Sequence, residues 1–190
     1  NVNEGRRALM PFYVPIDAGA SMVNFVSPEH LEICELLTDR LGIERSWNVV
    51  GVPLAGATTL SVDVSLVSGV ASIRLTELGS DLVEVVAAEL DALISYELGA
   101  VHLDVPLADE RAGAAVAELE RHGFCWATWI PNEHPGTGVK DAQRLDLVRL
   151  QRVGAHLTDG AHVLCARPEG EQLRDWVVGE WHRVRHGLSA

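Results

Sequence analysis

The chain has 190 residues, 47% of them apolar and 22% charged, and this balance indicates one globular domain rather than a disordered segment. Acidic residues outnumber basic residues 27 to 15, and the formal net charge of -12 disfavours nucleic acid as a partner because the phosphate backbone is repelled. No apolar run is long enough to span a bilayer, so we expect no membrane partner either.

The first predicted element is a strand over residues 8–14, which Pro15 ends. The run Ser27-Pro28-Glu29 then has the composition of a helix start, and Gly42 is the predicted stop of that helix. Residues 47–58 carry the least pattern in the chain, and we interpret them as a loop.

A hairpin follows this loop. Apolar and polar residues alternate over 60–66 and again over 71–75, on either side of a turn at Ser68-Gly69. Alternation with a period of two on both sides of a glycine turn predicts two antiparallel strands.

The second half of the chain alternates helices and strands. Ser80 is interpreted as the N-cap of a helix of roughly eighteen residues that ends at Gly99. A short strand is predicted over 101–105, and Asp109 caps a further helix that Gly123 ends.

Strands are predicted over 125–130, 145–153 and 162–166, and a turn-rich loop over 131–138 separates the first two. A final helix has a set of inward-facing apolar residues, namely Leu173, Trp176, Val177, Trp181 and Val184. The order of elements predicts an α/β fold with a mixed central sheet and helices on both faces. We expect a single domain over 1–190, with a core at about 8–153 and a strand–helix extension over 154–190.

The strand at 101–105, the helix after it and the run His122-Gly123-Phe124 together resemble the last third of GNAT-family N-acyltransferases. The resemblance implies a GNAT-like acyl-CoA N-acyltransferase fold, in which the hairpin and the long helix form the middle. The run at 103–107, LDVPL, is similar to one in C-terminal GNAT-like domains of larger bacterial proteins. In those proteins an intact acyltransferase domain often lies upstream. Because the chain begins with Asn1 rather than Met, we expect it to be processed or a piece of a longer protein.

The chain departs from the family where coenzyme A would bind. Active members hold its pyrophosphate on a loop of the form Gln/Arg-x-x-Gly-x-Gly/Ala at a helix N-terminus. The corresponding residues 74–82 read RLTELGSDL, with a single glycine and two acids. The tyrosine that serves the family as general acid, and its asparagine companion, fall on Leu119 and Ala112, which cannot donate a proton. The resemblance therefore holds for packing and fails for chemistry.

Four residues are candidates for a site if the chain is an active enzyme, in which case acetyl-CoA or another acyl-CoA is the cofactor. Glu77, at the end of a predicted strand, is the candidate catalytic base; the alternative is an exposed loop acid stabilised by the helix dipole. Arg74, Gly79 and Ser80 are the candidate cofactor-binding residues. For Arg74 the alternative is a solvated strand arginine, because it alternates with core residues.

Other chemistry-bearing residues have plainer interpretations. His182 and His186 are spaced i, i+4 but suit the C-terminus of a helix, so we expect no metal site. The cysteines, Cys34, Cys125 and Cys165, are odd in number and form no CxxC pair, which predicts buried thiols in a reducing, cytoplasmic setting.

Trp126 and Trp129 lie three apart on a predicted strand, so we expect them to point to opposite faces of the sheet. One of the two indole rings is then available to mark a groove or a partner surface.

Three hypotheses follow. The first is a degenerate GNAT-like domain with a binding, regulatory or assembly role, whose partner is an upstream acyltransferase domain or a second copy of the chain. The second is an active N-acyltransferase that moves an acyl group from acyl-CoA to an amine, with Glu77 as base. The third is a small-molecule binding module that uses Trp126, Trp129 and the loop at 131–138.

Overall fold

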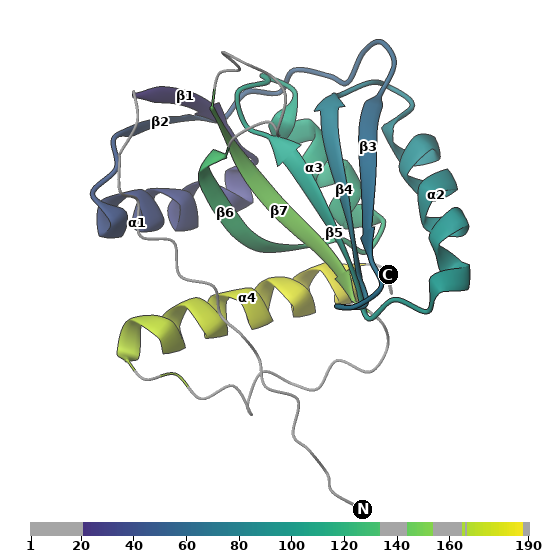
Figure 1. The fold of residues 1–190 in the computed structure, drawn as a ribbon. Helices are drawn as coiled ribbons and strands as arrows, with labels where there is room; N and C mark the ends of the chain where they lie inside the picture. The colour runs from purple at the N-terminus through teal and green to yellow at the C-terminus, as the bar shows by residue number, and fades with distance from the viewer. Residues whose placement is uncertain (1–20, 134–143, 154–164, 166, 188–190) are drawn as a thin grey trace, which may run out of the picture.

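The computed structural model describes residues 21–133, 144–153, 165 and 167–187. Its centre is a five-stranded mixed sheet, and the strands are, in spatial order, β3 (Thr59–Ser65), β4 (Val70–Glu77), β5 (Ala100–Pro106), β7 (Leu145–Val153) and β6 (Cys125–Glu133) (Figure 1). β4 and β5 run parallel, and the other neighbouring pairs run antiparallel. The predicted mixed sheet and its hairpin are confirmed. The strand expected over 8–14 lies outside the described residues, as does all but Cys165 of the one expected over 162–166.

Two helices, α2 (Leu82–Leu93) and α3 (Ala112–Arg121), contact each other; in Figure 1 α3 lies behind the strands and α2 lies to the right of β3. Each follows a strand and returns the chain to a parallel strand further along the sheet, so right-handed connections place both helices on one face. The long helix α4 (Pro168–Gly187) packs along β6 and α3. Among the described residues, no helix combines the length and the apolar character needed to cross a membrane.

A second, two-stranded parallel sheet consists of β1 (Met22–Phe25) and β2 (Arg45–Asn48). The short helix η1 (Pro28–His30) and α1 (Leu31–Leu41) connect them, and Gly42 ends α1 in the left-handed region, as predicted. The sequence did not predict these two strands, because four residues show too little alternation to identify a strand. The interpretation of residues 47–58 as a loop is therefore wrong at its first two positions.

A buried ion pair fixes the small sheet against the large one. The Nε atom of Arg45 in β2 lies 2.6 Å from Oδ2 of Asp146 in β7, and neither side chain is exposed to solvent. Asn24 of β1 donates a hydrogen bond of 2.7 Å to the same carboxylate oxygen. One carboxylate thus holds both short strands in place.

The two faces of the central sheet differ in chemistry. Ile73, Leu103 and Leu150 lie opposite one another on β4, β5 and β7, and all three are fully buried on the face that α2 and α3 cover. On the other face the next position of each strand is charged, namely Arg74, Asp104 and Arg149. The period-two pattern of the sequence therefore separates a core face from a polar face.

The prediction that Trp126 and Trp129 point to opposite faces is wrong. The register of β6 against β7 shifts between Trp126 and Thr128, which inserts one extra residue. Trp126 then lies opposite Leu150 and Trp129 opposite Val148, so both rings are on the same face and both are buried. A β-bulge of this kind reverses the side-chain alternation beyond it.

Candidate functional site

The junction between β4 and α2 is where the family resemblance implies a pyrophosphate site. The backbone N–H of Gly79 donates to the hydroxyl oxygen of Thr58 at 3.1 Å, and the N–H of Ser80 donates to the carbonyl oxygen of Gly56 at 3.0 Å. These are the two amides that the candidate residues Gly79 and Ser80 would offer to a phosphate. Both are already bonded to residues 56–58 of the same chain.

The contact between residues 56–58 and the junction is close at Gly79. A Cβ atom at that position would lie 2.3 Å from the carbonyl carbon of Ala57 and 2.3 Å from the amide nitrogen of Thr58. Only glycine fits at such an approach of two backbones. The lack of a side chain at Gly79 therefore allows residues 56–58 to pack against the junction.

The first residue after Ser80 reinforces this arrangement. Asp81 stands at the N-cap position of α2, and its Oδ1 atom accepts the backbone N–H of Thr58 at 2.7 Å. Hydrogen bonds from Thr58 lower the pKa of this carboxyl group, so it is ionised at neutral pH. The prediction that Ser80 is the N-cap is wrong: its hydroxyl donates to the Gly56 carbonyl at 3.2 Å, because residues 56–58 lie within its reach.

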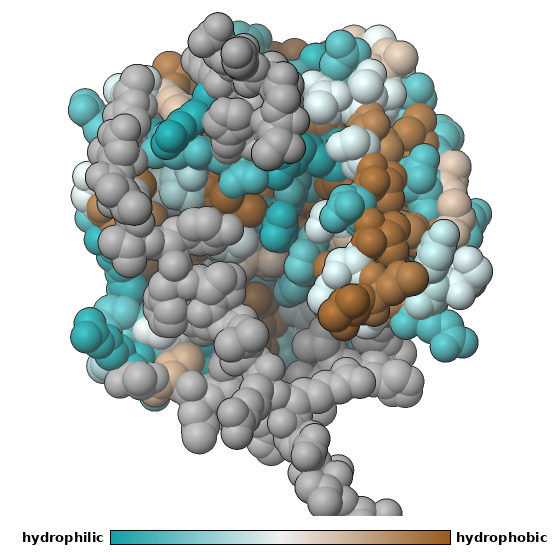
Figure 2. All heavy atoms as spheres, in the orientation of Figure 1, coloured by the Kyte–Doolittle hydropathy of each residue, from teal (hydrophilic) through white to brown (hydrophobic). Residues whose placement is uncertain are grey.

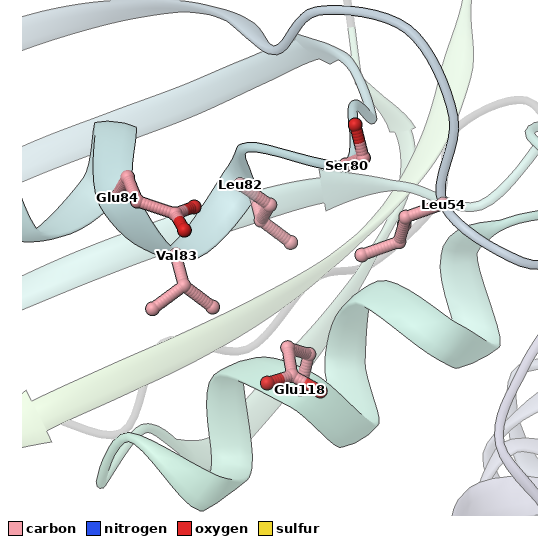
Figure 3. A pocket seen from close by; sticks show the side chains of 6 residues that line it. All are labelled: Leu54, Ser80, Leu82, Val83, Glu84 and Glu118. Atoms are coloured by element: carbon pink, nitrogen blue, oxygen red, sulfur yellow. The ribbon is translucent and has the colours of Figure 1, made fainter.

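A pocket of about 360 Å³ opens beside this junction, between the start of α2 and the middle of α3 (Figure 3). Its lining consists of Leu54, Ser80, Leu82, Val83, Glu84 and Glu118. Figure 3 shows the two carboxylates on opposite sides of the pocket, one on each helix. Carboxylates on both walls oppose a phosphate there.

The candidate base Glu77 lies at the last position of β4 and is exposed. Its Oε2 atom accepts a hydrogen bond of 3.2 Å from the hydroxyl of Thr59 on the neighbouring strand. Pairing between β4 and β5 ends three positions earlier, at Arg74 and Asp104, so the two strands separate before Glu77 is reached.

The candidate Arg74 belongs to a network of charges on the polar face. Its Nη2 atom lies 3.0 Å from Oε1 of Glu133 and 3.6 Å from Oδ2 of Asp104. The buried Asp104 carboxylate also accepts two hydrogen bonds from the guanidinium of Arg149, at 2.7 and 2.8 Å. Burial and the charge of Arg149 lower the pKa of the adjacent His102, so its imidazole is neutral at pH 7. Arg74, whose side chain is 28% exposed, thus pairs with one buried and one partly exposed carboxylate and is only partly solvated.

The positions of the family's proton donors are buried. Leu119 and Ala112 lie on the inner side of α3 and are almost completely excluded from solvent. An apolar side chain at these positions stabilises the contact of α3 with the sheet and has no proton to give.

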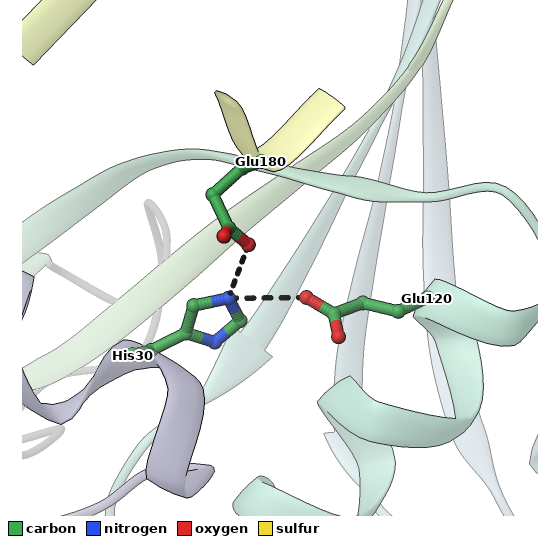
Figure 4. Close-up of side chains that lie close together, drawn as sticks. All are labelled: His30, Glu120 and Glu180. Atoms are coloured by element: carbon green, nitrogen blue, oxygen red, sulfur yellow. Dashed lines mark hydrogen bonds and ion pairs between the residues drawn. The ribbon is translucent and has the colours of Figure 1, made fainter. Parts of the chain in front are cut away.

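A buried cluster of ionisable groups lies elsewhere, between η1, α3 and α4 (Figure 4). The Nε2 atom of His30 is 3.0 Å from Oε1 of Glu120 and 3.1 Å from Oε2 of Glu180. The Nη2 atom of Arg183 lies 2.6 Å from the same Glu120 oxygen and 2.5 Å from the same Glu180 oxygen. His and Glu side chains are metal ligands, but here the Arg183 guanidinium and the His30 imidazole together already pair with both carboxylates, so the group fits an ion cluster better than a metal site.

The thiol groups are poor nucleophiles. Burial raises the pKa of Cys34 to about 12 and that of Cys125 to about 11, so both remain protonated at neutral pH. Both are buried, as predicted, while Cys165 is partly exposed.

No family model matches the sequence, and no curated protein matches it. Among the solved structures that are similar to it are two acetyltransferases. One is a probable acetyltransferase, with 17% identity over 50% of this chain and 54% of that chain and a TM-score of 0.37. The other is the ribosomal-protein-S18-alanine N-acetyltransferase from Escherichia coli, with 22% identity over 54% of this chain and 66% of that chain and a TM-score of 0.35. The aligned part spans about half the length of the first protein, and at these TM-scores neither likeness carries an inference about function.

Sequence reasoning missed two features of this region. Residues 56–58 carry no recognisable motif, and their contact with Gly79 depends on where the loop returns to the sheet. Asp104 and Arg149 were identifiable in principle, because both occupy polar positions within alternating strands.

Proposed function

We propose that this chain is a degenerate GNAT-like domain that binds no coenzyme A at the β4–α2 junction and has a binding, regulatory or assembly role. The single observation that supports it best is the pairing of the Gly79 and Ser80 amides with Thr58 and Gly56. A pyrophosphate gains its affinity from free amides at a helix N-terminus. Here those donors are already used.

Coenzyme A would also have to displace residues 56–58. Its entry would break the two amide hydrogen bonds and the bond from Thr58 to Asp81, each with a net contribution of about 1 kcal/mol. The diphosphate would then meet Asp81, Glu84 and Glu118 at short range. The loss of these internal hydrogen bonds and the repulsion between like charges both weaken the binding of coenzyme A.

Isothermal titration of the folded chain with coenzyme A tests the proposal. We expect no binding heat up to millimolar ligand, and no change in the hydrogen-exchange protection of the Gly79 and Ser80 amides. A dissociation constant in the micromolar range, with altered exchange at these two amides, would overturn the proposal.

The second candidate is the active N-acyltransferase. It is favoured by the exposed carboxylate of Glu77 just beyond the point where β4 and β5 separate. Turnover of acetyl-CoA with a panel of amines, abolished by Glu77→Gln, would establish this function. If a folded sample shows no such turnover, the proposal of a degenerate domain is retained.

The proposed partner is a protein, either an acyltransferase domain upstream in the same polypeptide or a second copy of this chain, in the cytoplasm. Both described buried thiols are unpaired, which is compatible with a reducing compartment. An assembly role requires a surface that favours association, and the edge of the central sheet offers one.

A further inference from the structure

The outer edge of β3 ends the central sheet. β3 pairs with β4 on one side, and among the described residues no strand pairs with its other side. A free edge of seven residues carries unpaired backbone donors and acceptors and can accept a further strand.

β3 has few of the features that normally keep an edge strand from pairing with another chain. It contains no proline and no lysine, and its only irregularity of register lies at its start, between Thr59 and Leu60. Asp63 is the only charged residue between Arg45 and Arg74. On a chain with a net charge of -12, this segment carries little of the like charge that would repel a second copy.

An apolar surface accompanies the edge. Leu60, Val62 and Val64 are only partly buried and form one row along β3. At the end of the strand Leu66 and Val67 are exposed, and the bond from the Gly99 amide to the Gly69 carbonyl brings the exposed Ile94 and Tyr96 of η2 (Ile94–Tyr96) to the same end of the sheet. Figure 2 shows a hydrophobic band along the side of the molecule where β3 runs in Figure 1.

The sequence of β3 is complementary to itself. In an antiparallel pair of two β3 strands centred on Val62, all seven residues have a partner. Leu60 then faces Val64 of the second copy, and Ser61 faces Asp63, whose carboxylate can accept the serine hydroxyl. A pair centred on Asp63 would instead oppose two carboxylates, so charge selects the first register.

We propose that two copies of this chain associate through β3, antiparallel and around a two-fold axis at Val62, so that two five-stranded sheets become one continuous sheet. The axis is perpendicular to the sheet, which keeps α2 and α3 of both copies on the same face and continues the row of Leu60, Val62 and Val64 across the interface. This inference specifies the partner of the proposed assembly role and rests on that role.

Two substitutions at one exposed position test the register. In the proposed dimer Ser61 faces Asp63, so Ser61→Asp opposes like charges twice and Ser61→Lys opposes opposite charges twice. We expect sedimentation equilibrium to show a dimer for the unmodified chain at about 10–100 µM, about ten-fold weaker dimerisation for Ser61→Asp and about ten-fold tighter dimerisation for Ser61→Lys.

A matched control is Ser46→Asp, the same change at an exposed serine of β2 (Arg45–Asn48), which should leave dimerisation unchanged. Circular dichroism confirms that each variant is folded. A monomeric unmodified chain, or a dimer that responds equally to both charges at position 61, overturns the proposal, and a monomer that instead takes up a strand of another protein does so as well. None of these outcomes alters the coenzyme A titration, so the two proposals can fail separately.

Discussion

Replacing His30 by glutamine should destabilise the fold in a pH-dependent way. His30 is the only group of η1 that reaches Glu120 of α3 and Glu180 of α4 in the buried cluster (Figure 4). Its Nδ1 atom is 3.0 Å from the hydroxyl of Ser27. Glutamine keeps a hydrogen-bond donor of similar length and removes the positive charge. The buried carboxylates would then depend on Arg183 alone.

The expected magnitude follows from burial. Removing one partner of a buried ion cluster leaves an uncompensated charge and costs about 3–5 kcal/mol. The pKa of Glu180 indicates a free energy of similar size. Burial raises this pKa, but hydrogen bonds from His30 and Arg183 outweigh burial and lower it from 4.5 to about 2. Such a shift corresponds to about 3 kcal/mol. We therefore expect His30→Gln to lose about 3 kcal/mol of unfolding free energy.

The sign of the pH dependence is determined by His30. Burial lowers its pKa, but hydrogen bonds to Glu120 and Glu180 outweigh burial and raise it above 6.5. A raised histidine pKa contributes stability that is complete below 6.5 and is lost as the pH rises through the folded-state value. The contribution of Glu180 is complete above 4.5 and is lost as the pH falls toward 2. The cluster therefore stabilises the fold most between pH 4.5 and pH 6.5.

Urea unfolding followed by tryptophan fluorescence measures the difference, at about pH 5.5 and about pH 8.5. The gap between the unmodified chain and His30→Gln should be largest at the lower pH and should narrow at the higher one. His186→Gln, the same change at an exposed histidine of α4, should stay within about 0.5 kcal/mol at both values. A loss below 1 kcal/mol for His30→Gln, or a gap that widens with pH, would refute the reasoning.

Three further outcomes are expected. Gly79→Ala should lower the unfolding free energy by about 1–3 kcal/mol in a urea titration, because the new methyl group meets the backbone of residues 57 and 58. Gly179→Ala has open space around its Cβ and should be neutral or stabilising. Equal effects of the two substitutions would contradict the close contact at Gly79. Asp146→Asn should lower the unfolding free energy by about 3–5 kcal/mol, because it removes the charge of one partner from the buried ion pair with Arg45, and an unchanged unfolding midpoint would contradict this. Since burial raises the pKa of Cys34 to about 12 and that of Cys125 to about 11, a thiol reagent at neutral pH should label at most one cysteine of the folded chain, and labelling of two or more would show that these thiols are accessible.

Local patterns in the sequence determined most of the elements. The alternation over 60–66 and 71–75 predicts the hairpin of β3 and β4, because a period of two places one row of side chains in the core. The buried stripe of α3 and the stop of α1 at Gly42 follow from helical spacing and from the left-handed conformation that glycine tolerates. These features depend on residues close together in the chain, so they can be identified without the fold.

Contacts between distant residues were decided by the tertiary structure alone. Residues 56–58 occupy the Gly79 junction, a bulge turns Trp126 and Trp129 to the same face, and His30 meets a glutamate 150 positions away. No local pattern specifies which amide a loop will cap or which charges will share a buried site, since the packing of the whole chain sets these distances. The sequence alone shows that the glycines of the GNAT pattern are missing from residues 74–82. Only the fold shows that residues 56–58 bond to the amides that a pyrophosphate would need there.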